Sequence, residues 1–121
     1  MRVFKVKTFA RFCRDEKIDD ARLLRAVEEI EAGLFDADLG SSLIKKRIAR
    51  EGQGKLGGYR TILAFKSGHR ALFVFGFAKS DRDNIGVADL RALRGLASEV
   101  LAFSEDEVAG RLNVGSWIEV K

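Results

Sequence analysis

The sequence contains no proline, one cysteine and one histidine, and each scarcity removes a class of protein. Cys13 alone cannot form an internal disulfide, and Cys13 with His69 cannot supply the ligands of a Cys/His zinc site. A catalytic Cys-His pair would require these two residues, which lie far apart in the sequence, to meet. No Pro- or Ser-rich linker divides the 121 residues, so we expect one hydrophobic core. We expect no metal and no cofactor.

Long apolar runs are absent as well. The N-terminal stretch "MRVFKVKTFARF" interrupts every apolar run with a charge, and no window approaches the length of a membrane span. The sequence therefore predicts neither a signal peptide nor a membrane helix, and we expect a cytoplasmic protein.

Charge is distributed unevenly along the chain, although the net value is only +4. Residues 45–82 carry ten cationic and two acidic side chains, whereas residues 1–44 and 83–121 each have a small acidic excess. Affinity for nucleic acids comes largely from charge neutralisation, so such a block suits a surface that faces phosphates. A solvated basic face is the alternative interpretation.

Hydrophobic periodicity predicts the element order βααβββα, which is typical of an α+β fold with a small, mostly antiparallel sheet flanked by helices. A short first strand should be followed by a helix capped by Thr8 and by a second helix that starts at Asp19 or Asp20. Gly33 should end that second helix, whose buried stripe is expected to include Leu34. A third helix should run from about residue 84 to Leu101 at a helical spacing of apolar residues.

The three central strands are expected at residues 43–50, 59–66 and 71–79. In the first of them, strand alternation places Lys45 and Arg47 on one face and Lys46 and Arg50 on the other. The last is apolar on both faces, as expected of a strand covered by helices, with three phenylalanines on one side: Phe73, Phe75 and Phe77. "SEDE" at 104–107 predicts a capping box and a short helix, and "SWIEV" predicts an edge strand or a docked tail.

The loop "GQGKLG" at 52–57 formally matches G-x-G-x-x-G. A dinucleotide-binding loop must lead into a helix, whereas a strand follows here, and no Gly-Lys-Ser/Thr triplet forms a Walker motif. The loop is instead interpreted as a connection between two strands, with Lys55 at its tip. Its glycines either allow the loop to approach a phosphate backbone closely or have no role beyond a simple connection between the strands.

Three stretches together resemble the RelE/HigB-type toxins of bacterial type II toxin-antitoxin systems: "KKRIAREGQGKLGGYRTILAFK", "FVFGFAKSDRDNI" and "DLRALRGLA". The resemblance covers roughly residues 3–103. It implies a RelE-like toxin domain at 1–103, with the helix and tail at 104–121 packed on it or extending it. It also implies cleavage of messenger RNA on the ribosome and inhibition by an antitoxin, in HigB-like members a helix-turn-helix protein encoded nearby. No apolar stripe exceeds what the sheet can bury, so we expect the free toxin to be monomeric.

The resemblance also implies roles for individual residues. Arg60 in "GGYR" matches the family's clamp on the scissile phosphate, and Lys79 and Arg82 match cations at the end of the third core strand. With Arg47 they form the expected catalytic set. The residues expected to bind RNA are Lys45, Lys46, Arg50, Lys55 and Tyr59. Strand alternation prevents Arg47 and Arg50 from facing one substrate equally, and Tyr59 either stacks on a base or packs in the core.

Metal-free RNA cleavage proceeds by attack of the ribose 2′-hydroxyl on the adjacent phosphorus, and arginine and lysine can stabilise the extra negative charge. The general base is unassigned, because relatives place a tyrosine near the C-terminus whereas the one tyrosine of this chain is Tyr59. Trp117 could pack the tail or contact a partner. Two other functions fit the same pattern: a ParE-type gyrase inhibitor, and a non-catalytic module that binds RNA or an antitoxin.

Overall fold

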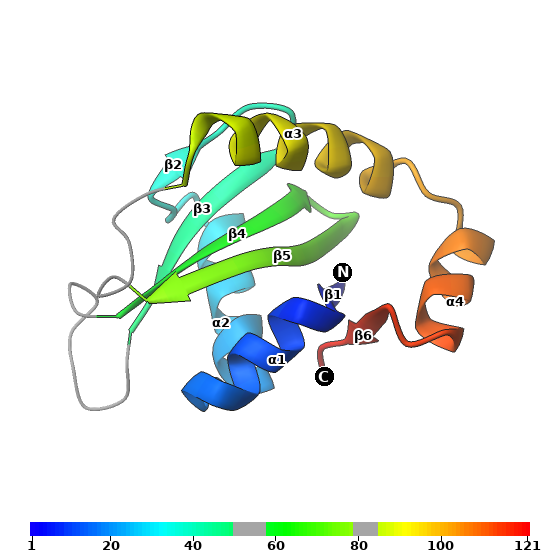
Figure 1. Cartoon of the computed structure of the whole chain (residues 1–121), viewed down its shortest axis with the longest axis horizontal. Coiled ribbons are helices and arrows are strands. Elements are labelled where there is room, and N and C mark those ends of the chain that lie inside the picture. Colours follow the sequence, from blue (N-terminus) through cyan, green and yellow to red (C-terminus); the bar gives the residue numbers. More distant parts are fainter. Residues whose placement is uncertain (50–57, 79–84) are drawn as a thin grey trace.

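A mixed six-stranded sheet forms the centre of the computed structural model, which describes residues 1–49, 58–78 and 85–121 (Figure 1). Helices α1 and α2 cover one face of the sheet, and α3 crosses the other face. The strands are β1 (Arg2–Val6), β2 (Ala37–Asp38), β3 (Leu43–Ile48), β4 (Tyr59–Lys66), β5 (Arg70–Ala78) and β6 (Trp117–Glu119). The helices are α1 (Lys7–Glu16), α2 (Asp20–Glu31), α3 (Val87–Leu101) and α4 (Glu105–Asn113).

The strand order is β2-β3-β4-β5-β1-β6, with β1 parallel to β5 and the other neighbours antiparallel. This arrangement confirms the predicted α+β class with a mostly antiparallel sheet. Of the edge strand and the docked tail left open near the C-terminus, the edge strand is present and pairs with β1. The two-residue strand β2 was not predicted, because so short a segment has no periodicity to detect. No helix in the described ranges has the length and apolarity needed to cross a membrane.

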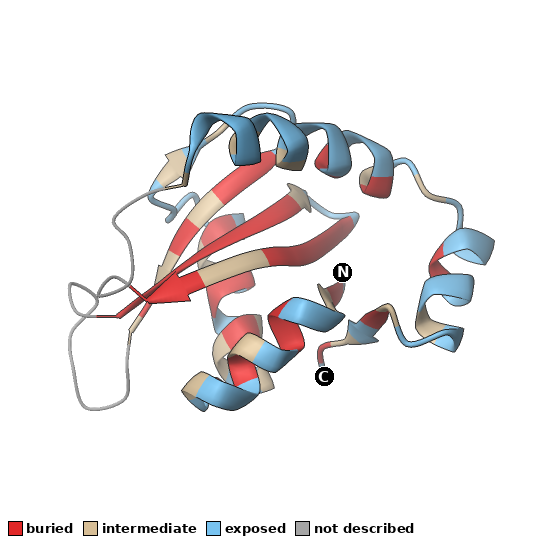
Figure 2. Ribbon diagram, in the orientation of Figure 1, coloured by how far each residue is buried: buried red, intermediate tan, exposed pale blue. Residues whose placement is uncertain are grey.

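The core between the sheet and α1 depends on aromatic packing. Phe9 stacks on Phe73 with ring centroids 5.1 Å apart, and Phe12 lies edge-on to Tyr59. A Cβ atom at Gly76 would lie 2.7 Å from Phe12, so glycine is required where α1 rests on β5. Figure 2 shows the result as a buried sheet between helices whose outer faces are exposed.

The ends of α2 follow the sequence signals, with one exception. The Asp19 carboxylate accepts a hydrogen bond from the N–H of Arg22, and Gly33 takes a positive φ just after the helix, as predicted. The prediction that Leu34 is buried is wrong, because it follows this turn and is 60% exposed. The predicted Thr8 cap is also wrong: α1 follows β1 directly, and its N-cap position is Val6.

A β-bulge in β5 corrects a third prediction. Two adjacent residues of β4 pair with Phe73 and Phe75, so Val74 is an extra residue on the β5 side. Phe73 therefore packs with the α1 core, whereas Phe75 packs with the core under α3 and contacts Phe77. The three phenylalanines do not share one face, because the bulge reverses the alternation between the first and the second.

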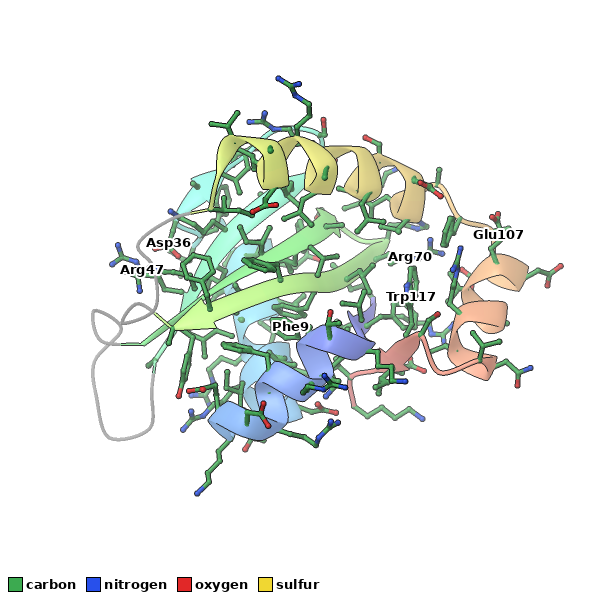
Figure 3. All side chains as sticks on the ribbon, viewed as in Figure 1. Phe9, Asp36, Arg47, Arg70, Glu107 and Trp117 are labelled. Atoms are coloured by element: carbon green, nitrogen blue, oxygen red, sulfur yellow. The ribbon has the colours of Figure 1, made fainter. Side chains whose placement is uncertain are left out.

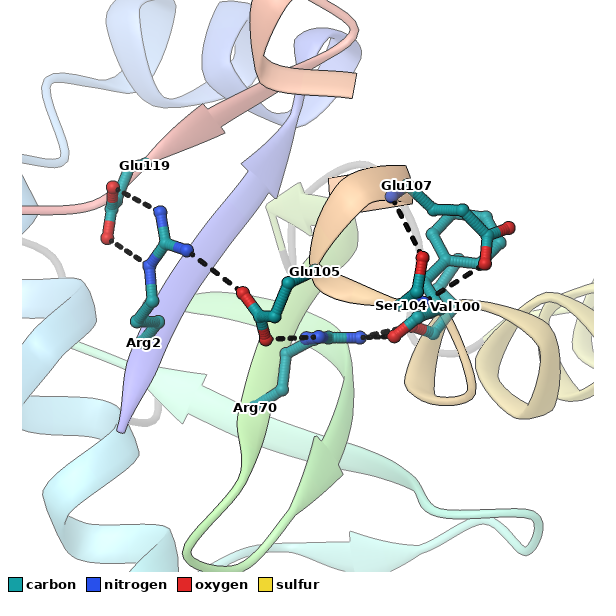
Figure 4. Close-up of polar contacts among 8 residues, drawn as sticks. Arg2, Arg70, Val100, Ser104, Glu105, Glu107 and Glu119 are labelled. Carbon is teal, nitrogen blue, oxygen red and sulfur yellow. Dashed lines mark hydrogen bonds and ion pairs between the residues drawn. The ribbon is translucent and has the colours of Figure 1, made fainter. Parts of the chain in front are cut away.

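The C-terminal segment is attached to the sheet by a buried arginine. Arg70 at the start of β5 is 3% exposed, and its guanidinium donates hydrogen bonds to the carbonyl oxygens of Val100 and Phe103 and to Glu105 (Figure 4). Trp117 is buried and stacks on Phe103, so it packs the tail. The predicted capping box at the start of α4 is also present.

Candidate functional site

Two arginines face each other across neighbouring strands at the end of the sheet where β4 begins. Arg47 of β3 is the direct register partner of Arg60 of β4. Direct partners on antiparallel strands have Cβ atoms about 4.5–5.5 Å apart and point to the same face. Ile62 lies two residues after Arg60 in β4, so the two side chains share a face of the sheet. Ile62 packs under α3, and both arginines therefore lie on the α3 side.

Both guanidinium groups have a buried nitrogen without a hydrogen-bond partner. Within the described ranges, the buried side-chain polar atoms that lack a partner are Nη1 of Arg60 and Nε of Arg47. Arg60 is only 5% exposed. Burying the charge of Arg60 without a counter-charge among the described residues is costly, and the two like charges on directly opposed residues repel each other. An anion that accepted hydrogen bonds from both groups would relieve both costs.

Asp36 partly compensates the charge of Arg47. Its Oδ1 lies 3.3 Å from Nε of Arg47 in an ion pair, and its Oδ2 accepts a hydrogen bond from the Arg47 backbone N–H. Figure 3 shows the two side chains next to each other at the end of the sheet. The Asp36 carboxylate thus accepts a hydrogen bond that the next backbone partner of β3 would otherwise accept, because β2 begins only one residue later, at Ala37. Among the described residues, Arg60 has no comparable counter-charge.

Aromatic side chains lie beside the arginine pair as a consequence of the bulge. Phe77 is the register partner of Arg60 on its other side, and Phe75 contacts Phe77 with ring centroids 5.8 Å apart. A low-polarity neighbourhood strengthens the interaction of a guanidinium with an anion. Sequence reasoning missed Phe77 and Asp36, because neither a bulge nor an edge-strand contact has a local signal.

The other described residues of the predicted site are divided between the two faces. Lys45 shares the face of the arginine pair and is partly exposed. Lys46 lies on the opposite face, where its Nζ is 2.7 Å from Glu29 and donates to the carbonyl oxygen of Leu34. A buried and paired ammonium is not available to a substrate on the other face, so Lys46 is removed from the candidate site.

Tyr59 also lies away from the arginine pair. Its ring is in the α1 core, and its hydroxyl donates to the carbonyl oxygen of Glu16. This is the packing alternative that the sequence left open, and Tyr59 is likewise removed from the site. Four predicted residues lie outside the described residues: Arg50, Lys55, Lys79 and Arg82.

The cysteine and the histidine take no part in this site. Cys13 is buried in the α1 core, and desolvation raises the pKa of its thiol to about 11. It is therefore protonated at neutral pH and is not a nucleophile there. His69 is exposed in the turn between β4 and β5, at the end of β4 opposite Arg60.

Comparison with known proteins agrees with the fold and identifies the family. The model of the RelE family, described as the RelE toxin of the RelE/RelB toxin-antitoxin system, matches residues 1–120. The protein is therefore a toxin of a toxin-antitoxin system. More specifically, the chain belongs to the RelE toxin family, and this membership implies a cognate antitoxin as its partner. A search of curated proteins found no match.

Proposed function

We propose that this toxin is a metal-independent endoribonuclease that cleaves messenger RNA on the ribosome, with Arg60 and Arg47 binding the scissile phosphate. The observation that carries the proposal is the facing pair of arginines, each with a buried nitrogen that makes no hydrogen bond. A bridging phosphodiester would supply the missing acceptors, and arginine's planar fork suits phosphate oxygens. Membership of the RelE toxin family supports the proposed nuclease activity.

The chemistry follows from the charge of the site. The 2′ oxygen attacks phosphorus, the bond from phosphorus to the 5′ oxygen breaks, and a 2′,3′-cyclic phosphate and a 5′-hydroxyl result. The 2′-hydroxyl gives up its proton, and the leaving 5′ oxygen takes one. The phosphate oxygens gain negative charge at the transition state, which is where Arg60 and Arg47 act. A site with two guanidinium groups and Lys45 repels divalent cations, which favours a metal-independent reaction.

We assign the positioning of the RNA to the ribosome. The described site supplies charge stabilisation, and alignment of the 2′-hydroxyl with the leaving oxygen contributes a further large part of the rate. A surface that holds the message in a bent geometry can provide that alignment. Lys79, Arg82, Arg50 and Lys55 stay proposed contacts to the message, and the protein is proposed to act in the cytoplasm, free of its antitoxin, as a monomer.

Expression of the toxin without its antitoxin tests this function. We expect growth arrest together with cuts inside translated messages, mapped by primer extension, and we expect co-expression of the antitoxin to restore growth. Arrest with intact messages and accumulated cleaved DNA would replace the proposal with gyrase inhibition. Normal growth, with the toxin present and folded, would indicate a non-catalytic binding module.

A further inference from the structure

A hollow beside Arg47 contains an exposed aromatic side chain that the proposed phosphate site does not use. The hollow is lined by Leu34, Phe35, Asp36, Lys46 and Arg47. Its volume of ≈ 220 Å³ is below the range of about 300–1,000 Å³ that is usual for small-molecule pockets. It would hold a single ring system rather than a larger ligand.

Phe35 is 40% exposed, and the backbone on both sides of it is fixed. On the N-terminal side, Leu34 donates its N–H to the carbonyl oxygen of Glu29 and accepts a hydrogen bond from the Lys46 ammonium. On the C-terminal side, Asp36 donates its N–H to the carbonyl oxygen of Lys45, and its carboxylate binds Arg47.

This arrangement differs from an ordinary exposed side chain on a loose loop. The hydrogen bonds hold the backbone that carries a ring left 40% exposed, which lowers the entropy lost when a flat partner stacks on that ring. The buried Lys46, which the sequence assigned to RNA binding, acts here through the backbone that carries Phe35.

We infer that Phe35 is a stacking platform for an unpaired nucleobase of the RNA, next to the phosphate bound by Arg47. The inference rests on the proposed function and deepens it. Arg47 lines the hollow and also faces Arg60, so one nucleotide can place its phosphate between the arginines and its base against Phe35. Aromatic stacking of splayed bases is a common way to hold single-stranded RNA. An acidic peptide of the antitoxin is the alternative occupant, and it is less favoured because the Asp36 carboxylate in the same hollow repels an acidic side chain but not an uncharged base.

The test compares Phe35→Ala and Phe35→Tyr in the full-length toxin. The probe is a short single-stranded RNA whose 2′-hydroxyl at the cleavage position is replaced by hydrogen, free or loaded on ribosomes. Loss of one stacked base weakens binding by about 5- to 150-fold, which corresponds to roughly 1–3 kcal/mol. We expect a loss in this range for Phe35→Ala and near wild-type binding for Phe35→Tyr. Val114→Ala, which removes an exposed apolar side chain near β6, should bind as wild type.

Abasic probes identify the contact. One probe lacking a single base should bind the wild type more weakly, whereas Phe35→Ala should bind that probe and the intact probe equally. The inference would be overturned if Phe35→Ala bound the intact RNA as tightly as the wild type does. It would also be overturned if removing any base of the probe weakened wild-type binding equally, or if Phe35→Ala weakened only the binding of the antitoxin. If Phe35→Ala leaves RNA affinity unchanged while the wild type still cuts messages, only the base subsite fails. If the wild type cuts nothing, the proposed function fails first.

Discussion

Replacing Arg60 with methionine is expected to abolish cleavage of translated messages while leaving the free energy of unfolding unchanged or higher. Arg60 is buried, lies opposite another arginine, and has an unpartnered Nη1. Its charge is therefore unfavourable to the folded state, and methionine fills a similar volume without that cost. Exchange of a buried charge for an apolar side chain is often neutral or stabilising, here by about 1 kcal/mol.

The loss of activity should be large because the group acts at the transition state. Removal of one preorganised donor to a developing oxyanion typically lowers kcat by about 100- to 1,000-fold. Arg60→Lys is the matched control. It keeps the charge but cannot form bidentate hydrogen bonds to a phosphate, so we expect intermediate activity. The measurements are chemical denaturation and primer extension on messages from cells expressing each variant. Wild-type cleavage by a folded Arg60→Met protein would contradict the role of Arg60.

Replacing Arg70 with methionine is expected to have the opposite signature. We expect the free energy of unfolding to fall by about 2–4 kcal/mol, because the carbonyl oxygens of Val100 and Phe103 lose a charged donor in a buried position. Arg2→Met is the matched control, since the Arg2 side chain is 48% exposed in its ion pairs with Glu105 and Glu119. Exposed pairs of this kind contribute about 0–1 kcal/mol.

The Arg70 variant also tests how the chain is divided. We propose that residues 104–121 extend the toxin domain at 1–103 and unfold with it, because Arg70 of β5 contacts both the end of α3 and the start of α4. Thermal unfolding should then show one transition at lower temperature, with the cleavage rate per folded molecule unchanged. An unshifted main transition, with only the C-terminal segment becoming sensitive to protease, would contradict a single domain.

The sequence predicted the elements that have local signals. Asp19 and Gly33 mark the ends of α2, the capping box marks the start of α4, and alternation separates Arg47 from Lys46. Each of these signals acts within a few residues, so one stretch of chain contains the whole cause.

The features missed by the sequence depend on contacts between distant segments. The bulge at Val74 arises only when β4 and β5 pair, because β5 has one more residue than β4 at that point. It places Phe77 beside Arg60. The contact between Asp36 and Arg47 requires the turn after α2 to reach the sheet edge. Facing arginines also run against the usual preference for opposite charges across strands, so local rules do not favour them. Such exceptions are expected at functional sites.

The central claim is that Arg47 and Arg60 together bind one phosphate of the message. The most direct measurement is a structure of the toxin on a ribosome carrying a message with a 2′-deoxy nucleotide at the cleavage position, which blocks the reaction. The account predicts oxygens of the scissile phosphate within hydrogen-bonding distance of both guanidinium groups, with Nη1 of Arg60 among the donors. A scissile phosphate held by other residues, with both arginines turned away from the RNA, would contradict it.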